Sequence, residues 1–178
     1  EMLQLCQQKD VGMVGAKLYY PDDTIQHAGV VVGLGGVAAH VLCKLPRDAE
    51  GYMGRLRCVQ EISAVTAACM MVKTSVFKAV GGFDEELKVA FNDIDLCMKV
   101  RKYGVKIVFT PYAELYHYES KSRGMEDTPE KQLRFSREVN CFRRKWEREL
   151  LKGDPYYNPN LTLNNTDCSL RKQEKNGD

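Results

Sequence analysis

Two apolar runs near the N-terminus, separated only by a turn, constrain the fold of this chain most strongly. The first run, residues 11–20, is rich in β-branched residues and ends at the turn-forming residues Pro21, Asp22 and Asp23. The second run, residues 24–33, follows directly. A connection this short joins neighbouring antiparallel strands, because parallel strands need a much longer crossover. The sequence therefore predicts a buried strand and an antiparallel hairpin.

Later segments alternate between helical and extended patterns. Apolar residues at a spacing of three to four predict a helix over residues 93–103, and Gly104 provides its stop. Residues 105–110 and 113–118 are predicted to be extended segments on either side of Pro111. Strands that alternate with helices indicate an α/β protein, and the hairpin makes its sheet mixed.

The other predicted elements complete this α/β pattern. They are a helix at the first residues, a long loop over residues 35–57 and a central strand within residues 59–73. A short helix is predicted from Thr74 or Ser75 to Val80, and it ends at Gly81 and Gly82. A long C-terminal helix is predicted over residues 129–151, with Thr128 as its cap and Pro129 at its first position. The last ten residues are predicted to be disordered.

Composition limits the classes of function. The 178 residues suit one domain, and a net charge of +2 gives no reason to expect a nucleic-acid partner. The seven cysteines are odd in number and form no close pair, which is typical of reduced thiols in a cytoplasmic protein. No apolar run reaches the roughly 18 residues of a membrane-spanning helix. The chain opens on Glu1 within a helical pattern, so we expect it to be a piece of a longer protein.

An acidic cluster marks the start of the helix predicted over residues 93–103. Asn92, Asp93 and Asp95 can act there simply as helix-capping residues that complement the helix dipole. Alternatively, Asp93 is a general base that takes a proton from an acceptor hydroxyl in an inverting sugar transfer. In that hypothesis Asp95 holds the helix or an acceptor hydroxyl.

His117 follows Asp93 after one helix-sized and one strand-sized segment, so both are expected at one edge of the sheet. A histidine between tyrosines is commonly a packed residue. The alternative is a ligand for a divalent cation, Mn²⁺ or Mg²⁺, that stabilises a departing nucleoside diphosphate; imidazole suits Mn²⁺ better. For His27 and His40, packing or hydrogen bonding within a loop is the expected role.

Lys121 and Arg123 lie in a basic, hydroxyl-rich loop. This loop is either a solvated surface segment or a flap over a diphosphate, with the two cations as anion partners. The basic residues that follow form an ordinary solvated helix face, or a peripheral contact with anionic lipid at the inner face of the membrane.

Six blocks, in this order, resemble one known family. They are VGMVGAKLYYPDDTIQHAGVVVG, ISAVTAACMMVK, VGGFDEEL, AFNDIDLCMKVRKYG, TPYAELYHYESKSRG and DPYYNPNLT. The chain resembles the C-terminal half of a glycosyltransferase family 2 domain of the GT-A (nucleotide-diphospho-sugar transferase) fold. It is most similar to bacterial enzymes of rhamnan, O-antigen and other cell-surface polysaccharide synthesis.

The resemblance implies a nucleotide-sugar donor, a glycan acceptor and a role for each matching residue. Asp93 corresponds to the base, His117 to a metal ligand, and Thr66 and Ala67 to a strand that lines the pocket. Two residues depart from the family pattern, because Asn92 replaces the usual Glu and Ala67 the usual Gly. The family's nucleotide-binding half, with its metal-binding DxD motif, is absent from the chain.

These inferences set the expected organisation. Residues 1–163 form the acceptor and catalytic-base part of a GT-A domain, and residues 164–178 form a disordered tail. The fragment alone is expected to transfer no sugar, and exposed strand edges favour a homodimer. The main alternative is a non-catalytic carbohydrate-binding or interaction module. A nucleotidyltransferase is a third, which the FDE and HYES blocks do not suit.

Overall fold

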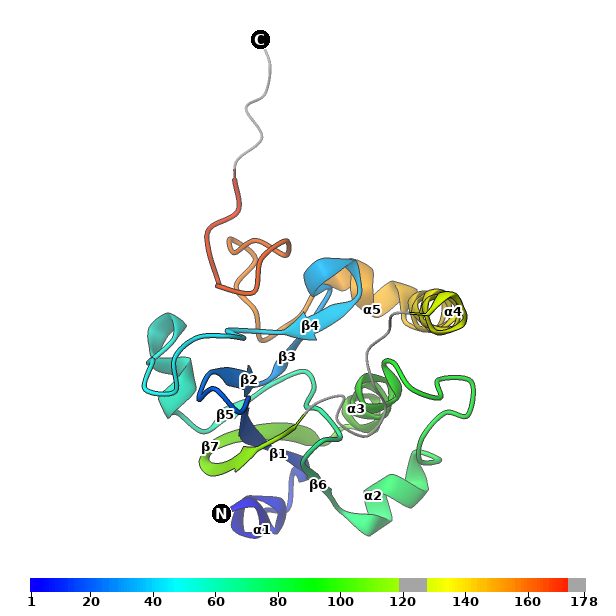
Figure 1. Cartoon of the computed structure of the whole chain (residues 1–178). Coiled ribbons are helices and arrows are strands. Elements are labelled where there is room, and N and C mark those ends of the chain that lie inside the picture. The colour runs from blue at the N-terminus through cyan, green and yellow to red at the C-terminus, as the bar shows by residue number, and fades with distance from the viewer. Residues whose placement is uncertain (119–127, 173–178) are drawn as a thin grey trace.

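The computed structural model describes residues 1–118 and 128–172 and shows a mixed α/β fold, which confirms the predicted class (Figure 1). The α-helices are α1 Met2–Cys6, α2 Thr74–Ala79, α3 Asn92–Lys102, α4 Pro129–Lys145 and α5 Glu147–Lys152, and the 3₁₀ helices are η1 Leu34–Gly36 and η2 Tyr52–Arg57. The strands are β1 Val11–Tyr19, β2 Ile25–His27, β3 Val30–Val32, β4 Ala38–His40, β5 Gln60–Glu61, β6 Met70–Val72 and β7 Lys106–Tyr116.

The main sheet has the order β2-β1-β7-β5, and β6 also pairs with β1. The central strands β1 and β7 are parallel, whereas β2, β5 and β6 join them in antiparallel fashion. The sheet is therefore mixed, as predicted. Every residue of β1 is buried because β1 has neighbours on both edges and cover on both faces.

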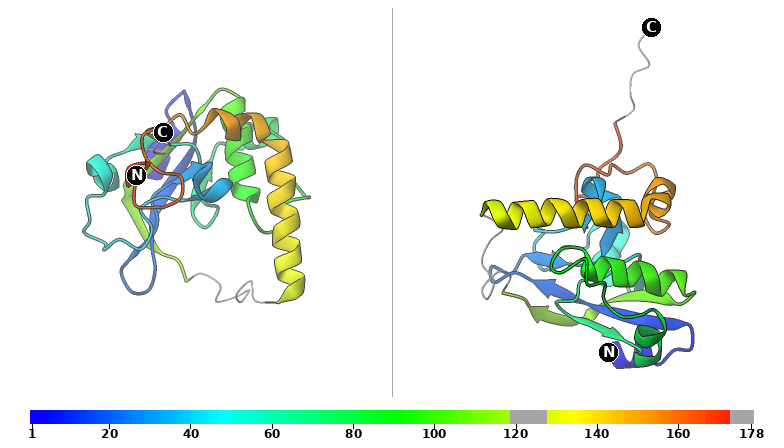
Figure 2. Two further views of the ribbon diagram at one scale, coloured as in Figure 1. Left: turned by 90° about the horizontal axis from the view of Figure 1, so that it is seen from above. Right: turned by 90° about the vertical axis from the view of Figure 1, so that its right-hand side faces the viewer.

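Helices cover the sheet on both faces. On one side α1 packs against β1 through a small core that includes Cys6, Val14 and Val108. On the other side lies α3, and α4 runs beyond α3 as a further layer (Figure 2). The main core therefore fills the space between the sheet and α3, and it reaches α4 at Phe142.

The predicted second strand, residues 24–33, is in fact two strands. Its first part, β2, forms the expected hairpin with β1, and its second part, β3, pairs with β4 in a separate two-stranded sheet. Gly29 separates them with a φ of 107°, a conformation that favours glycine. The predicted loop over residues 35–57 was also wrong, since it contains β4 and η2.

The predicted central strand within residues 59–73 was wrong as well. Only its ends are extended: β5 lies at the edge of the sheet beside β7, and β6 pairs with β1. The residues between them are irregular because side chains of α3 bind their backbone, as described below. The central strands are β1 and β7 instead.

The extended segments on either side of Pro111 form one strand, β7, rather than two. Its pairing with β1 moves from Ala16 opposite Thr110 to Lys17 opposite Glu114. The extra residues form a bulge, which is where a sheet accommodates proline.

The helices follow the sequence pattern closely. The predicted helix ending at Gly81 and Gly82 is α2, although Lys73 rather than Thr74 or Ser75 is its N-cap. Thr128 caps α4 as predicted, since its Oγ1 accepts a hydrogen bond from the Lys131 amide.

The long C-terminal helix is interrupted once. It divides at Trp146 into α4 and α5, and Trp146 has a φ of −114° and a ψ of 22°. The indole of Trp146 is buried between α4 and α5, so the residue that interrupts the helix packs into the core.

Residues 164–172, expected in the tail, pack against the domain. Cys168 is buried, and the Leu42 amide donates to the Thr166 carbonyl at 2.6 Å. Residues 173–178 lie outside the described residues. All seven cysteines are free thiols. In the two described ranges, no helix is long and apolar enough to cross a membrane.

Candidate functional site

Asp93 occupies the first turn of α3, and two backbone amides fix its carboxylate. Oδ1 accepts a hydrogen bond from the Ile94 amide at 2.9 Å, and Oδ2 accepts one from the Ala67 amide at 3.0 Å. The preceding residue, Asn92, accepts from the Asp93 amide through its side chain at 2.7 Å. Asp93 is half-buried. The carboxylate therefore has a fixed orientation and remains partly accessible.

One face of α3 holds the segment 63–67 in place, and we call these contacts the α3 clamp. They join Asp93 to the Ala67 amide at 3.0 Å, Cys97 Sγ to the Val65 amide at 3.4 Å, and Arg101 to Ser63 Oγ at 3.1 Å. Four helical residues advance about 6 Å, and two extended residues advance about 6.6 Å, so the two spacings match. The clamp explains why this apolar segment is not a regular strand.

Gly15 allows the clamped segment to lie directly on β1. A Cβ atom at Gly15 would stand 2.3 Å from Val65 Cγ1, which is shorter than any normal contact. Glycine is therefore required for this close approach. As a result β1, segment 63–67 and α3 form one packed unit behind the Asp93 carboxylate.

Thr66 is half-buried and Ala67 is exposed, and both lie at the outer side of this packed unit. The Thr66 hydroxyl accepts from the Ala68 amide at 3.3 Å, and the Thr66 amide donates to His27 Nε2 at 3.5 Å. The structure thus brings Asp93, Thr66 and Ala67 together. Their roles in binding a sugar stay predictions.

His27, on β2, is fully buried behind Thr66. Because its Nε2 accepts from the Thr66 amide, its Nδ1 carries the proton and donates to His40 Nδ1 at 2.9 Å. Burial, and then the neighbouring His40, hold the pKa of His27 well below its usual value. His27 is therefore a neutral, packed residue, in line with the role expected for it.

The depressed pKa of His27 predicts a pH-dependent stability. Below pH ~6.5 the unfolded chain binds a proton at His27 that the folded chain does not, so acid favours unfolding. The free energy of unfolding should fall between pH 7 and pH 5, by at most about 1.4 kcal/mol per pH unit from this residue. Urea unfolding of the wild type and His27→Gln at both pH values measures it. Equal pH slopes would contradict the prediction.

His117 follows the end of β7, and β2 fixes its ring. Its Nδ1 lies 2.8 Å from Gln26 Oε1, and its amide donates to the Tyr19 carbonyl at 3.0 Å. The amide oxygen of Gln26 can only accept, so Nδ1 carries a proton, and in the neutral tautomer of the ring Nε2 then has the lone pair. Metal-binding histidines commonly have this arrangement.

The described residues do not complete a metal site. Within residues 1–118 and 128–172, no group of three or more His, Cys, Asp and Glu side chains could hold a metal ion. In the same part of the chain, no hydrogen bond or ion pair joins Asp93 to His117. Both neighbourhoods contact β2, where Gln26 binds His117 and His27 binds the Thr66 amide.

Asp95 is an interior residue with no exposed surface. Its Oδ1 accepts from Trp146 Nε1 at 2.8 Å and pairs with Lys145 at 2.8 Å, and its Oδ2 pairs with Lys99 at 3.2 Å. Of the two roles expected for Asp95, this geometry matches the one in which it holds the helix. Lys121 and Arg123, the expected diphosphate partners, lie outside the described residues.

Sequence reasoning missed three residues that shape this site. Cys97 and Arg101 complete the α3 clamp, and His27 binds the Thr66 amide. The spacing of Asp93, Cys97 and Arg101 at intervals of four was visible in the sequence as one face of a helix. Nothing in the sequence indicated what that face contacts.

Comparisons with known proteins agree with the α/β fold. A family model described as "Glycosyltransferase like family 2" matches residues 1–138. The chain is 58% identical over 171 residues to an uncharacterized protein, y4gI, of Sinorhizobium fredii, which covers 96% of this chain and 19% of that protein. It is 38% identical over 179 residues to the O-antigen biosynthesis protein RfbC of Myxococcus xanthus, covering 100% of this chain and 14% of that protein.

A third relative matches a shorter region. The N-acetylglucosaminyl-diphospho-decaprenol L-rhamnosyltransferase of Mycobacterium tuberculosis is 36% identical over 62 residues, which is 35% of this chain and 20% of that protein. The chain thus spans a fifth or less of the length of these curated relatives. No solved structure matches it.

Proposed function

This chain belongs to glycosyltransferase family 2, and we propose that it carries the catalytic base and the acceptor side of an inverting sugar-transfer site. Family membership rests on the model that matches residues 1–138. The relatives named for O-antigen biosynthesis and for rhamnosyl transfer support a growing cell-surface polysaccharide as the acceptor. We further propose that the donor is a nucleotide-sugar.

The observation that carries this proposal is the anchored but accessible carboxylate of Asp93. In the proposed reaction an acceptor hydroxyl attacks the anomeric carbon while the bond to the nucleoside diphosphate breaks. Asp93 takes the hydroxyl proton, and the diphosphate leaves with the bonding electrons. Because the Ala67 and Ile94 amides hold the carboxylate, it needs no reorientation to accept the proton.

We propose that Nε2 of His117 is one ligand of a divalent cation. Such a cation would stabilise the charge on the leaving diphosphate. The hydrogen bond between Nδ1 and Gln26 supports this role, since it leaves Nε2 able to bind a metal. We propose that its further ligands lie outside the described residues, so the proton transfer to Asp93 is the only step that we assign.

Product stereochemistry tests the proposed reaction directly. A protein that carries this segment, incubated with a nucleotide-sugar and a glycan acceptor, should form a glycoside whose anomeric configuration is opposite to that of the donor. Proton NMR of the product distinguishes the two anomers. Retained configuration would contradict the role of Asp93 as a base. Glycan binding without any transfer would favour the non-catalytic carbohydrate-binding module.

A further inference from the structure

Glu138 is a buried carboxylate that the proposed reaction does not use. It lies on α4 and is 3% exposed, although glutamate is rarely buried without partners. Its Oε1 accepts a hydrogen bond from the Val89 amide at 3.1 Å, and its Oε2 accepts one from the Ala90 amide at 2.9 Å. Arg134, one turn earlier on α4, pairs with Oε2 at 3.8 Å. The carboxylate thus binds α4 to the backbone of a different segment.

The two amides that Glu138 binds lie at the end of the segment that leads into α3. This segment, residues 80–91, contains neither helix nor strand, so its path is set by the groups that bind its backbone. Val89 and Ala90 precede Asp93 by only four and three residues. Glu138 therefore holds the chain just before it enters the turn of α3 that carries Asp93.

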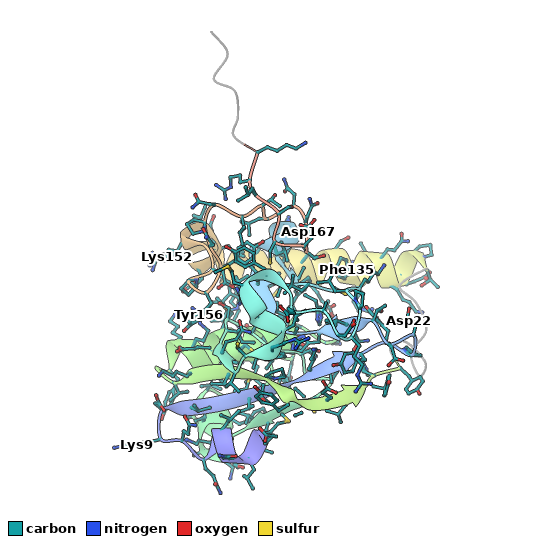
Figure 3. All side chains as sticks on the ribbon, turned by 90° about the vertical axis from the view of Figure 1, so that its left-hand side faces the viewer. Lys9, Asp22, Phe135, Lys152, Tyr156 and Asp167 are labelled. Carbon is teal, nitrogen blue, oxygen red and sulfur yellow. The ribbon has the colours of Figure 1, made fainter. Side chains whose placement is uncertain are left out.

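Phe91 joins this segment to α3 in a disfavoured conformation. Its φ of 62° and ψ of 5° are left-handed, which residues other than glycine rarely adopt. Its carbonyl accepts from the Asp95 amide at 2.8 Å and so begins the hydrogen bonds of α3. The rings of Phe135 (Figure 3) and Phe142, both on α4, have centroids 5.8 and 5.4 Å from that of Phe91. Such a conformation persists only where the surroundings impose it, and here α4 provides them.

The two bonds at Glu138 require a carboxylate. Each of its oxygens accepts from one amide, whereas the NH₂ group of a glutamine would face one of these donors and leave it unpaired. Because the site is buried, the lost acceptor is costly. The carboxylate of Asp93 depends on the result, since it binds the Ala67 amide of a separate segment at 3.0 Å, and a displaced first turn of α3 would break this contact.

We propose that Glu138 is a positioning residue for Asp93. By binding the two amides that precede Phe91, it fixes the first turn of α3 with the Asp93 carboxylate against the Ala67 amide. Glu138 acts only through the backbone and touches no reacting atom. The inference deepens the proposed function and rests on it, because Asp93 is the base in that proposal.

Hydrogen exchange tests the positioning without any sugar transfer. In a protein that carries this segment, mass spectrometry with fragmentation to single residues compares the wild type with Glu138→Gln. The two amides that Glu138 binds should exchange about tenfold faster in the variant, as expected for a lost hydrogen bond. The amides of Ala67 and Ile94, which the Asp93 carboxylate binds, should exchange at least about threefold faster as well.

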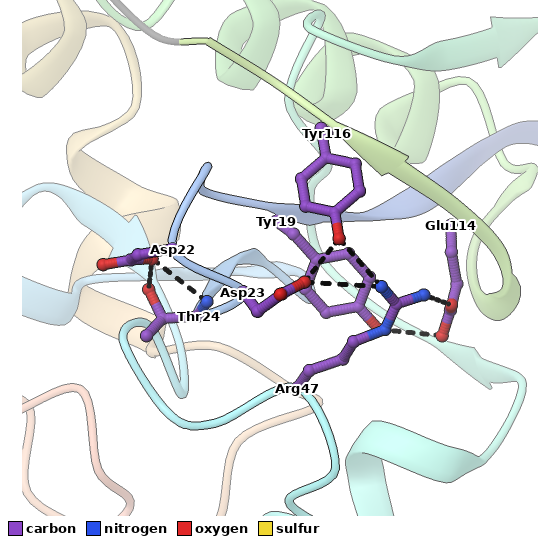
Figure 4. Close-up of polar contacts among 7 residues, drawn as sticks. All are labelled: Tyr19, Asp22, Asp23, Thr24, Arg47, Glu114 and Tyr116. Atoms are coloured by element: carbon purple, nitrogen blue, oxygen red, sulfur yellow. Dashed lines mark hydrogen bonds and ion pairs between the residues drawn. The ribbon is translucent and has the colours of Figure 1, made fainter.

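Glu114 provides a matched control. Its two oxygens also accept one donor each, from the Tyr19 hydroxyl at 2.8 Å and from Arg47 at 2.6 Å (Figure 4), but it lies on β7 and its side chain is 39% exposed. Glu114→Gln should therefore leave the exchange of the Ala67 and Ile94 amides as in the wild type. Wild-type exchange at these amides in Glu138→Gln, or equal acceleration in Glu114→Gln, would overturn the inference.

Kinetics give a second readout, which a merely structural role would not change. Glu138→Gln should lower kcat about 10- to 100-fold with a nearly unchanged KM for the donor, since a slightly misplaced catalytic group has this effect. In the Asp93→Asn background the same substitution should change kcat less than about twofold, because the base that it positions is already absent. Equal losses in both backgrounds would overturn the inference.

Glu138→Gln should fold, because glutamine keeps the volume of the side chain and one of its two hydrogen bonds. Far-ultraviolet circular dichroism checks this. Glu138→Asp, which keeps the charge and both acceptor oxygens, is the second variant and should lose less kcat than Glu138→Gln.

Failure of this inference differs from failure of the proposed function. Full kcat in Asp93→Asn would refute the base and leave the exchange of the Ala67 and Ile94 amides as the measure of positioning. Unchanged exchange at these amides in Glu138→Gln, together with an inactive Asp93→Asn, would overturn the inference alone.

Discussion

Replacing Asp93 by asparagine should slow sugar transfer about 10²- to 10⁴-fold in a protein that carries this segment, and should leave donor affinity nearly unchanged. Asparagine cannot accept the hydroxyl proton, and this proton moves only as the transition state forms. The loss should therefore appear in kcat rather than in KM. Steady-state kinetics with saturating donor and varied acceptor measures it.

A structural effect of Asp93→Asn has to be separated from the chemical one. The carboxylate accepts from the Ala67 and Ile94 amides through its two oxygens, and an asparagine amide can serve only one of them. A lost acceptor costs about 1–3 kcal/mol of stability, which urea unfolding detects. Asn92→Ala, which removes only the neighbouring contact, is the matched control and should retain most of the activity. A folded Asp93→Asn variant with normal kcat would exclude Asp93 as the base.

Asp95→Ala should lower the free energy of unfolding by about 3–5 kcal/mol, the typical cost of breaking a buried ion pair. Asp95 is completely buried and joins α3 to the corner between α4 and α5 through Trp146 and Lys145. Its removal leaves the indole N–H of Trp146 without an acceptor and Lys99 without its ion-pair partner. Urea unfolding followed by tryptophan fluorescence measures the loss.

A second ion pair of the same N–O distance, but on the surface, provides a control variant. Asp10 pairs with Lys106 at 2.8 Å, as Asp95 does with Lys145, but Asp10 is 59% and Lys106 47% exposed. Asp10→Ala should therefore cost less than about 1 kcal/mol. Similar losses in the two variants would show that burial does not set the strength of these pairs.

The sequence predicted those elements whose pattern is local. Strand β1 follows from one apolar run, and α3 from the spacing of its apolar residues and from Gly104. The residues between β5 and β6 could not be predicted in this way. An apolar run fits both a strand and an irregular buried segment, and here Cys97 and Arg101, more than thirty residues away, decide between the two.

In the candidate site, too, contacts between residues far apart in the sequence could not be predicted. The family resemblance assigned roles to Asp93, Thr66 and Ala67; the structure places these residues side by side, and their roles stay predictions. The burial of Asp95 could not be foreseen, because it depends on Trp146 and Lys145 from the far end of the chain.

The α3 clamp has a mechanical consequence. Because the helix that bears Asp93, the proposed base, also binds the segment bearing Thr66 and Ala67, any tilt or slide of α3 carries both along as a single rigid piece. The position of Asp93 relative to Thr66 and Ala67 would then survive small displacements of the surrounding layers. Substitutions in distant core layers that merely shift the helix should therefore be tolerated better than those that loosen its hold on residues 63–67.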